Sequence, residues 1–164
     1  MPLSDEELAA RFVALRDQDA FAELVRRYQS PVRGFLRHLT GDPSLADDIA
    51  QDTFVRTWRK LHTFSRKGRL TAWIMRLAYR EFLQTIRRRD RHGRLLDRLA
   101  SETLADSASQ PRHERADLVR FLGVLSPDER VAIILGYGYG FSHDEIRGIT
   151  GMPPGPSNLT FAGA

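Results

Sequence analysis

The spacing of the apolar residues constrains the fold most, because it follows the turn of an α-helix along most of the chain. Between residues 21 and 28, apolar side chains recur at positions i, i+3, i+4 and i+7 (Phe21, Leu24, Val25 and Tyr28). This spacing places them on one face of a helix, where they can pack into a core. No segment alternates between polar and apolar residues as a half-buried strand does, and no internal repeat is present. We therefore expect an all-α fold.

Short capping sequences indicate where several helices begin. Ser4-Asp5-Glu6-Glu7 has the spacing of a capping box, in which the serine and the glutamate side chains each bind the other residue's backbone N–H. Asp42-Pro43 is typical of an N-cap followed by the first helical residue. The expected elements are a helix after Ser4, a helical segment in which Pro31 opens a new turn and which ends at Thr40-Gly41, a helix from Pro43 to about Leu61, a loop at residues 62–69 and a long helix from about Leu70 to Arg89.

Composition divides the chain into two helical modules. We expect the first at residues 1–91 and the second at residues 114–164. Residues 92–113 are polar and rich in serine, which predicts a flexible linker that contains at most a short helix near residues 95–99.

The second module carries its own helix signals. Ser126–Glu129 and Ser142–Glu145 are two further capping boxes, and Phe141 and Ile146 have the spacing of a hydrophobic staple. The glycine-rich stretch at residues 136–140 is expected to break the helix between them. These signals predict two short helices joined by a turn.

The charge of the chain is concentrated in one block, although the net charge is only +4. From Arg56 to Arg98 there are 14 basic and 3 acidic residues, which gives this block a charge of +11. The rest of the chain has 11 basic and 18 acidic residues and carries −7. A basic block in an otherwise acidic protein indicates a surface for a polyanion such as nucleic acid. On charge alone, a solvated arginine-rich helix surface is the alternative.

Within the basic block, four arginines fall on one side of the expected long helix. At about 100° per residue, Arg69, Arg76, Arg80 and Arg87 lie within an arc of about 40°. Guanidinium groups donate paired hydrogen bonds to phosphate oxygens, so such a row suits a nucleic-acid backbone.

Aromatic residues beside this row provide stacking candidates. Trp73 and Gln84 border the arginines, and an aromatic ring at such a place can stack on an unpaired base. Phe64 and Tyr79 are further candidates for stacking. For Trp73, a position in or at the boundary of the core is the alternative.

Catalytic and metal-binding patterns are missing from the sequence. The five histidines are scattered without the spacing of zinc ligands, and no cysteine is present. No glycine-rich phosphate-binding loop follows a strand. We therefore expect neither an enzyme nor a bound cofactor. The N-terminus is acidic and no run reaches the roughly 20 apolar residues of a membrane span, so we expect no membrane span and a cytoplasmic protein.

Two segments around the basic block carry a family pattern, TGDPSLADDIAQDTFVRTWRKLHTF and LTAWIMRLAYREFLQTIRRR. They contain Gly-Asp-Pro, Ala-Asp-Asp, Gln-Asp-x-Phe, a tryptophan four residues later, and Ala-Trp-Ile-x-Arg in the next helix. This pattern resembles region 2 of the extracytoplasmic-function (group IV) sigma factors of the sigma-70 superfamily. A later segment, SPDERVAIILGYGYGFSHDEI, resembles the start of region 4. The resemblance covers most of the chain and implies a sigma factor that directs RNA polymerase to promoters and initiates transcription.

The resemblance also implies contacts for individual residues. In this family, region 2 docks on the clamp helices of the polymerase β′ subunit, which assigns polymerase contacts to Asp48, Gln51 and Asp52. The family recognises and melts the −10 promoter element with a loop and the helix that follows it, and captures a base flipped out of the non-template strand. The promoter DNA contacts then fall on Phe64, Ser65, Arg66, Lys67, Gly68, Arg69, Trp73, Arg76, Arg80, Gln84, Arg87 and Arg88. An anti-sigma factor is a further candidate partner.

The chain departs from the family pattern in the helix and at the C-terminus. Arg80 stands where many relatives carry asparagine, and Gln84 where they carry aspartate or asparagine, which leaves the base preference open. Arg147 and Thr150 replace small or apolar residues. Residues 156–164 contain no lysine or arginine, although relatives continue there with a basic recognition helix. We interpret this tail as a truncated or frameshifted region 4 and assign no −35 recognition to it.

Two other functions stay open from the sequence. One is a sigma-like interaction protein that binds core polymerase or an anti-sigma factor without productive −35 recognition. The other is a general basic regulator that binds nucleic acid but not polymerase.

Overall fold

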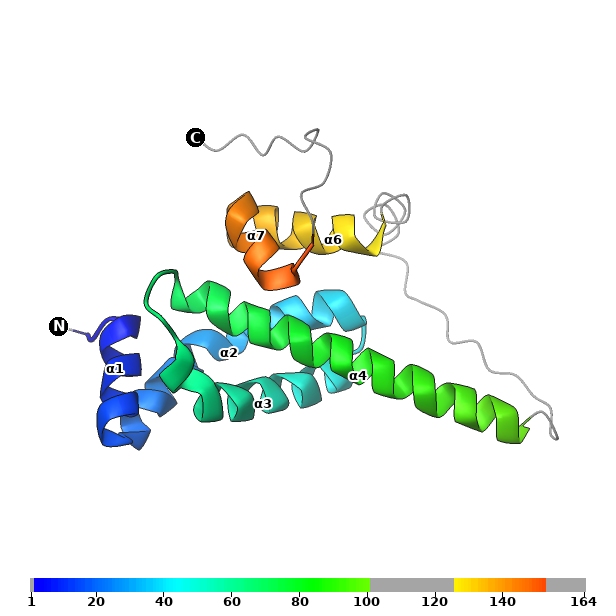
Figure 1. Cartoon of the computed structure of the whole chain (residues 1–164), viewed down its shortest axis with the longest axis horizontal. Helices are drawn as coiled ribbons and strands as arrows, with labels where there is room; N and C mark the ends of the chain where they lie inside the picture. The colour runs from blue at the N-terminus through cyan, green and yellow to red at the C-terminus, as the bar shows by residue number, and fades with distance from the viewer. Residues whose placement is uncertain (1, 101–125, 153–164) are drawn as a thin grey trace.

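The computed structural model describes residues 2–100 and 126–152, in which all regular elements are helices and no strand occurs (Figure 1). The all-α expectation is therefore confirmed. The elements are α1 (Asp5–Leu15), α2 (Gln18–Thr40), α3 (Pro43–Lys60), the 3-10 turn η1 (Leu61–Thr63), α4 (Leu70–Ala100), α6 (Pro127–Ile133), the π-helical turn η3 (Ile134–Gly138) and α7 (His143–Thr150).

The predicted caps form at the predicted places. The Ser4 hydroxyl accepts the N–H of Glu7 at 3.2 Å, and the Glu7 carboxylate accepts the N–H of Ser4 at 2.7 Å. The Asp42 carboxylate accepts two backbone N–H groups at the start of α3, and Gly41 ends α2 with a φ of 65°. A further cap, in which Asp17 begins α2, was missed by the sequence analysis. Each cap satisfies backbone groups that a helix end leaves without partners.

Helices α1 to α4 pack around one apolar core. Val32, Phe35 and Leu36 of α2 are fully buried, and Met75 and Ala78 of α4 face them from the other side of the core. Figure 1 shows α4 crossing over α2 and α3. Because one side of α3 and one side of α4 are fixed by the core, the opposite sides of both helices face solvent.

The sequence suggested that Pro31 opens a new turn. In the structure, Pro31 instead lies inside the continuous helix α2. A proline in a helix interior removes one hydrogen bond and costs about 3 kcal/mol or more. Tyr28, Val32 and Phe35 on either side of it are buried on the same face of α2. Burial of this continuous apolar face outweighs the local cost, so tertiary packing decides the conformation.

Helix α4 is longer than predicted. It was expected to end near Arg89 but continues to Ala100, so the predicted linker at residues 92–113 begins inside a helix. The polar composition of this stretch was misleading, because arginine, leucine and alanine are strong helix formers whether or not they are buried. Residues 101–113, the start of the second module at residue 114 and the tail at 156–164 lie outside the described residues. The division into modules stays a prediction.

The described part of the second module contains both predicted capping boxes, at Ser126 and Ser142. The staple residues Phe141 and Ile146 are both buried. The glycine-rich stretch does not break the helix at once, since η3 continues it to Gly138 before the chain turns at Gly140 with a φ of 67°. This helical pair lies against α2 and α4 (Figure 1).

Candidate nucleic-acid interface

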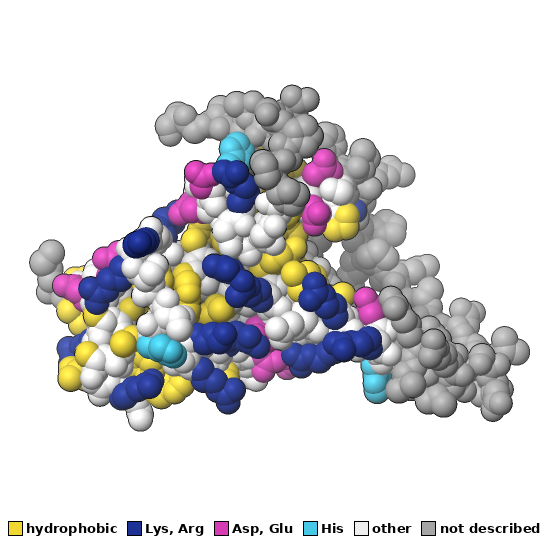
Figure 2. All heavy atoms as spheres, in the orientation of Figure 1, with side chains coloured by type: hydrophobic (Ala, Val, Ile, Leu, Met, Phe, Trp, Pro, Cys, Tyr) yellow, Lys and Arg dark blue, Asp and Glu magenta, His cyan; other side chains and the backbone are white. Residues whose placement is uncertain are grey.

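The outer side of α4 carries the predicted row of arginines. Arg76, Arg80, Arg87 and Arg88 are all exposed, and none of them forms an ion pair with a described residue. Figure 2 shows lysine and arginine side chains gathered over this part of the molecule. Positive charge that no acidic side chain neutralises remains available to an external polyanion.

The loop before α4 presents further polar and basic groups. Ser65, Arg66, Lys67 and Gly68 are exposed, as the sequence analysis expected. Arg66 has a φ of 57°, a left-handed conformation that non-glycine residues adopt uncommonly. Such conformations concentrate at functional sites, where the surrounding structure holds them in place.

Arg69 differs from the other arginines of the row. It precedes the first residue of α4, and its Nη1 lies 3.5 Å from Oε1 of Glu145 on α7. Its guanidinium carbon lies 5.2 Å from the centre of the Phe141 ring. The row therefore consists of arginines on α4 that have no ion-pair partner among the described residues, and of Arg69 at the end of the loop, which has one.

The aromatic candidates for stacking occupy different environments. Phe64 and Trp73 are half-buried and pack on each other, with 5.9 Å between their ring centres. Tyr79 is buried and stacks on Phe82, so its interpretation as a base-stacking residue was wrong. Burial raises the pKa of the Tyr79 hydroxyl, and the charge of Asp128 adds to this effect. Trp73 is the boundary residue that the sequence analysis gave as its alternative, with part of its ring still accessible.

Gln84 belongs to a polar network between α3 and α4 that the sequence analysis missed. Glu81 is buried and forms an ion pair with the Arg56 side chain from α3. Arg56 Nη2 also donates to Oε1 of Gln84 at 3.4 Å. The sequence held one signal of this network, since Glu81 is the only acidic residue between Asp52 and Asp90. A buried carboxylate in a basic segment requires a cationic partner.

The predicted polymerase contacts lie together on α3. Asp48, Gln51 and Asp52 are exposed at helical spacing, and Asp48 and Asp52 form no ion pair with a described residue. Asp47 is half-buried, and its Oδ1 lies 3.5 Å from Nε of Arg33 and 3.6 Å from Nη2 of Arg37, both on α2. The neighbouring aspartates thus have different environments: Asp47 is paired with α2, and Asp48 faces solvent.

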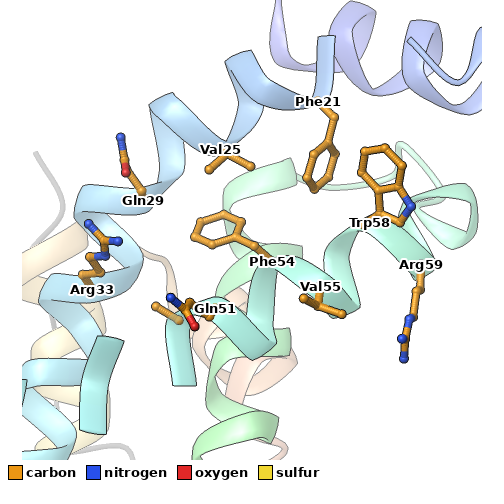
Figure 3. Close-up of a pocket in the computed structure, with 10 residues that line it drawn as sticks. Phe21, Val25, Gln29, Arg33, Gln51, Phe54, Val55, Trp58 and Arg59 are labelled. Atoms are coloured by element: carbon orange, nitrogen blue, oxygen red, sulfur yellow. The ribbon is translucent and has the colours of Figure 1, made fainter. Parts of the chain in front are cut away.

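An apolar groove of about 660 Å³ between α2 and α3 adjoins these contacts (Figure 3). Val25 and Phe54 line it together with Gln51, and Val55 and Trp58 border it with 50% and 36% of their surface exposed. Trp58 is the tryptophan that follows Gln-Asp-x-Phe in the family pattern. Its ring packs 4.6 Å from that of Phe12 on one side and faces the groove on the other. The acidic face of α3 therefore continues into an exposed apolar surface.

Two classes of site have no counterpart in the described residues. No group of three histidine, cysteine or acidic side chains is placed to hold a metal ion there. Among the same residues, no helix has the length and apolar character needed to span a membrane.

Sequence comparison finds a family and close relatives. The family model of sigma-70 region 2 matches residues 24–92. The chain is 32% identical over 148 residues to RNA polymerase sigma factor CarQ of Myxococcus xanthus, covering 87% of this chain and 83% of that protein. It is 31% identical to ECF RNA polymerase sigma factor SigK of Mycobacterium sp. (strain KMS), covering 87% of this chain and 78% of that protein.

Structural comparison agrees. The fold is similar to that of the sigma factor RpoE in complex with the anti-sigma factor NepR from Bartonella quintana, with a TM-score of 0.63, 28% identity, and coverage of 81% of this chain and 84% of that one. It is also similar to CnrH in complex with the cytosolic domain of CnrY, with a TM-score of 0.64, 26% identity, and coverage of 91% of this chain and 84% of that one.

The relatives decide between the functions left open by the sequence. Sigma factors bind RNA polymerase and DNA to initiate transcription, and they are not enzymes. The expected function as a sigma factor and the expectation that the protein is not an enzyme are therefore confirmed. The chain belongs to the extracytoplasmic-function sigma factors of the sigma-70 family.

Proposed function

We propose that α4 and the loop before it bind the −10 region of the promoter. The observation that carries this proposal is the exposed row of Arg76, Arg80 and Arg87, which have no ion-pair partner among the described residues. Each guanidinium can neutralise a phosphate, and the counterions released from DNA then favour binding. Arg88 is also exposed and lies next to Arg87, on the adjoining side of the helix.

The loop and the half-buried aromatics supply contacts of a second kind. Ser65, Arg66, Lys67 and Gly68 are accessible to a displaced single strand, and Trp73 with Phe64 offers a ring surface at the edge of the core. Stacking of a base on an aromatic ring contributes about 1–3 kcal/mol, and unstacking a base from the duplex costs a few kcal/mol. These contacts therefore offset the cost of opening the promoter.

Run-off transcription tests this role. Promoters are selected from a randomised DNA library with holoenzyme that contains the full chain. We expect the triple variant Arg76→Ala, Arg80→Ala, Arg87→Ala to yield far less transcript than the wild type. The matched control Arg26→Ala, Arg59→Ala, Arg130→Ala removes the same charge from exposed positions on α2, α3 and α6. Equal loss of transcript in both variants would contradict the assignment to α4.

The exposed face of α3 is the proposed contact with the clamp helices of the β′ subunit. Asp48, Gln51 and Asp52 provide acidic and polar groups, and Val55 and Trp58 provide adjoining apolar surface. A polar rim beside exposed apolar residues is the usual composition of a protein interface. Because polymerase is cytoplasmic, we place the protein there.

Charge reversal tests the α3 contact. We expect Asp48→Arg with Asp52→Arg to lower co-purification with core polymerase at least about tenfold, because like charges across an interface cost several kcal/mol. Glu6→Arg with Asp19→Arg, at exposed positions on α1 and α2, is the control. Normal recovery of core polymerase with the α3 variant would rule out this face.

An anti-sigma factor is the third proposed partner. One of the two similar solved structures is a sigma factor in complex with the anti-sigma factor NepR, and the other is CnrH in complex with the cytosolic domain of CnrY. Capture of a protein encoded beside the gene tests this partner. The capture is repeated with the Asp48→Arg, Asp52→Arg variant, and its loss there would indicate that polymerase and the captured protein bind the same face of α3.

A further inference from the structure

We infer that the helical pair at residues 126–152 is an intramolecular competitor of promoter DNA for the Arg69 end of the binding loop. The inference rests on the proposed role of α4 and its loop in binding DNA. It concerns the contact between α4 with its preceding loop and α7.

The first part of the contact engages Arg69 directly. Glu145 approaches one edge of the guanidinium at 3.5 Å, and the Phe141 ring lies over its face at 5.2 Å. A phosphate oxygen would use the same edge and a flipped base would use the same face. Arg69 therefore cannot bind DNA through these two surfaces while Glu145 and Phe141 occupy them.

The second part fixes the pair to α2. The Tyr139 hydroxyl donates to the backbone oxygen of Pro31 at 3.1 Å, and the Tyr139 ring packs edge-on against Phe35, with 6.1 Å between the ring centres. Gly34 provides the space, because a Cβ at this position would lie 3.0 Å from the Tyr139 hydroxyl oxygen. Glycine is unfavourable inside a helix, and here its missing side chain admits the phenol.

The charges of the two surfaces are complementary. Residues 126–152 contain four acidic residues and two arginines, whereas the block from Arg56 to Arg98 carries +11. The ion pair is partly exposed, with 54% of the Arg69 side chain and 24% of the Glu145 side chain accessible. Partly exposed pairs are weak and are screened by salt, so DNA with its dense charge can displace the acidic partner.

Conservative variants weaken this contact without removing the helices that form it. Glu145→Gln removes the charge beside Arg69 and retains the capping box, because glutamine serves in that position as well as glutamate does. Tyr139→Phe removes the hydroxyl and keeps the ring against Phe35. Glu129→Gln is the matched control, because Glu129 has the same place in the capping box of α6 and forms the two hydrogen bonds of that box with Ser126.

The first experiment measures binding of the full chain to a fluorescein-labelled DNA duplex with a central unpaired bubble, at low salt. We expect the Glu145→Gln, Tyr139→Phe variant to bind about threefold more tightly than the wild type, in keeping with a partly exposed ion pair. Glu129→Gln should bind like the wild type. Gly34→Ala should also tighten binding, while the melting temperature stays the same or rises because alanine favours the helix.

The second experiment follows the contact itself. The chain contains no cysteine, so His38→Cys on α2 and Gly148→Cys on α7 give two unique sites for spin labels. Both positions are exposed, and a side chain at Gly148 would meet no atom within 4 Å. We expect one short label-to-label distance in the free protein and a longer one when the bubble DNA is bound.

The outcomes separate this inference from the proposed function. Bound DNA with an unchanged label distance, or unchanged affinity in the Glu145→Gln, Tyr139→Phe variant, would overturn the competition alone. Equal tightening by Glu129→Gln would also overturn it, because the effect would then reflect net charge. Failure of the wild-type chain to bind the bubble DNA would overturn both the competition and the proposed role of α4.

Discussion

Helices α3 and α4 pack their apolar sides into the same core, yet their outer sides carry opposite charge. On α3, Asp48 faces solvent without an ion pair among the described residues, whereas Asp47 lies between two arginines of α2. On α4, Arg76 and Arg80 face solvent, whereas Glu81 is buried against Arg56. Both helices therefore carry charges that are paired where they touch the fold, and solvent-facing charges that have no ion-pair partner in the part of the chain that the structure describes.

This difference separates charge that serves folding from charge that serves binding. A buried charge is tolerated only with a partner, so its loss should change stability. An exposed charge contributes little to stability, so its loss should change the affinity for a partner of opposite sign. The two helices then present two surfaces of opposite charge, one proposed for polymerase and one for DNA.

The largest effect on stability is expected from the buried pair. Arg56→Met leaves the Glu81 carboxylate buried without a cation and should lower the free energy of unfolding by about 3 kcal/mol. Arg76→Met removes the same charge from the exposed side of α4 and should change it by less than about 0.5 kcal/mol. Urea denaturation of both variants measures the difference. Equal stability of the Arg56→Met and Arg76→Met variants would contradict the idea that the paired charge serves folding and the exposed charge serves binding.

Two neighbouring aspartates sharpen the comparison on a single helix. Asp47→Asn removes a half-buried partner of Arg33 and Arg37 and should lower the free energy of unfolding by about 0.5–1 kcal/mol. Asp48→Asn should leave the stability unchanged and weaken core polymerase binding several-fold. Denaturation measures the stability of both variants, and pull-down assays measure their binding to core polymerase. The comparison fails on α3 if Asp47→Asn weakens polymerase binding more than Asp48→Asn does.

A third effect appears only at high pH and concerns a paired group that is neutral. Burial and then the hydrogen bond to Asp5 raise the pKa of Tyr28 to about 12, whereas an unfolded tyrosine titrates near 10. The folded state holds the proton more tightly, so this contribution to stability is complete below pH 10 and is lost as the pH rises from 10 to 12. Tyr28→Phe should reduce the loss of unfolding free energy between pH 10 and 12. Tyr137→Phe, at an exposed position, should leave this loss as large as in the wild type. Chemical denaturation at pH 9 to 12 measures both.

Local signals allowed much of the fold to be predicted. Ser4-x-x-Glu7, Asp42-Pro43 and the two serine boxes of the second module each act within one turn of helix, and each forms as expected. The positions that local reasoning missed depend on distant contacts. Pro31 is held inside α2 by packing of the residues around it, and the side chain of Glu81 is neutralised from α3.

The site could be predicted less fully than the fold. Helical spacing places Arg76, Arg80 and Arg87 on one side, and all three are exposed. The same spacing included Arg69, but its partners Phe141 and Glu145 lie just before α7 and on α7, 72 and 76 residues later in the chain. Spacing also gave no indication that Tyr79 points into the core. Periodicity identifies the side of a helix, whereas a packed neighbour decides which residues on it remain accessible.

The central claim is that exposed arginines of α4 bind the phosphates of promoter DNA. The most direct test is the slope of the logarithm of the binding constant against the logarithm of salt concentration, measured with the bubble DNA. Each lost phosphate contact reduces the slope by about 0.7–0.9, so Arg76→Ala, Arg80→Ala, Arg87→Ala should reduce it by about 2 to 3. A slope unchanged from the wild type, or reduced equally by the Arg26→Ala, Arg59→Ala, Arg130→Ala control, would contradict the claim.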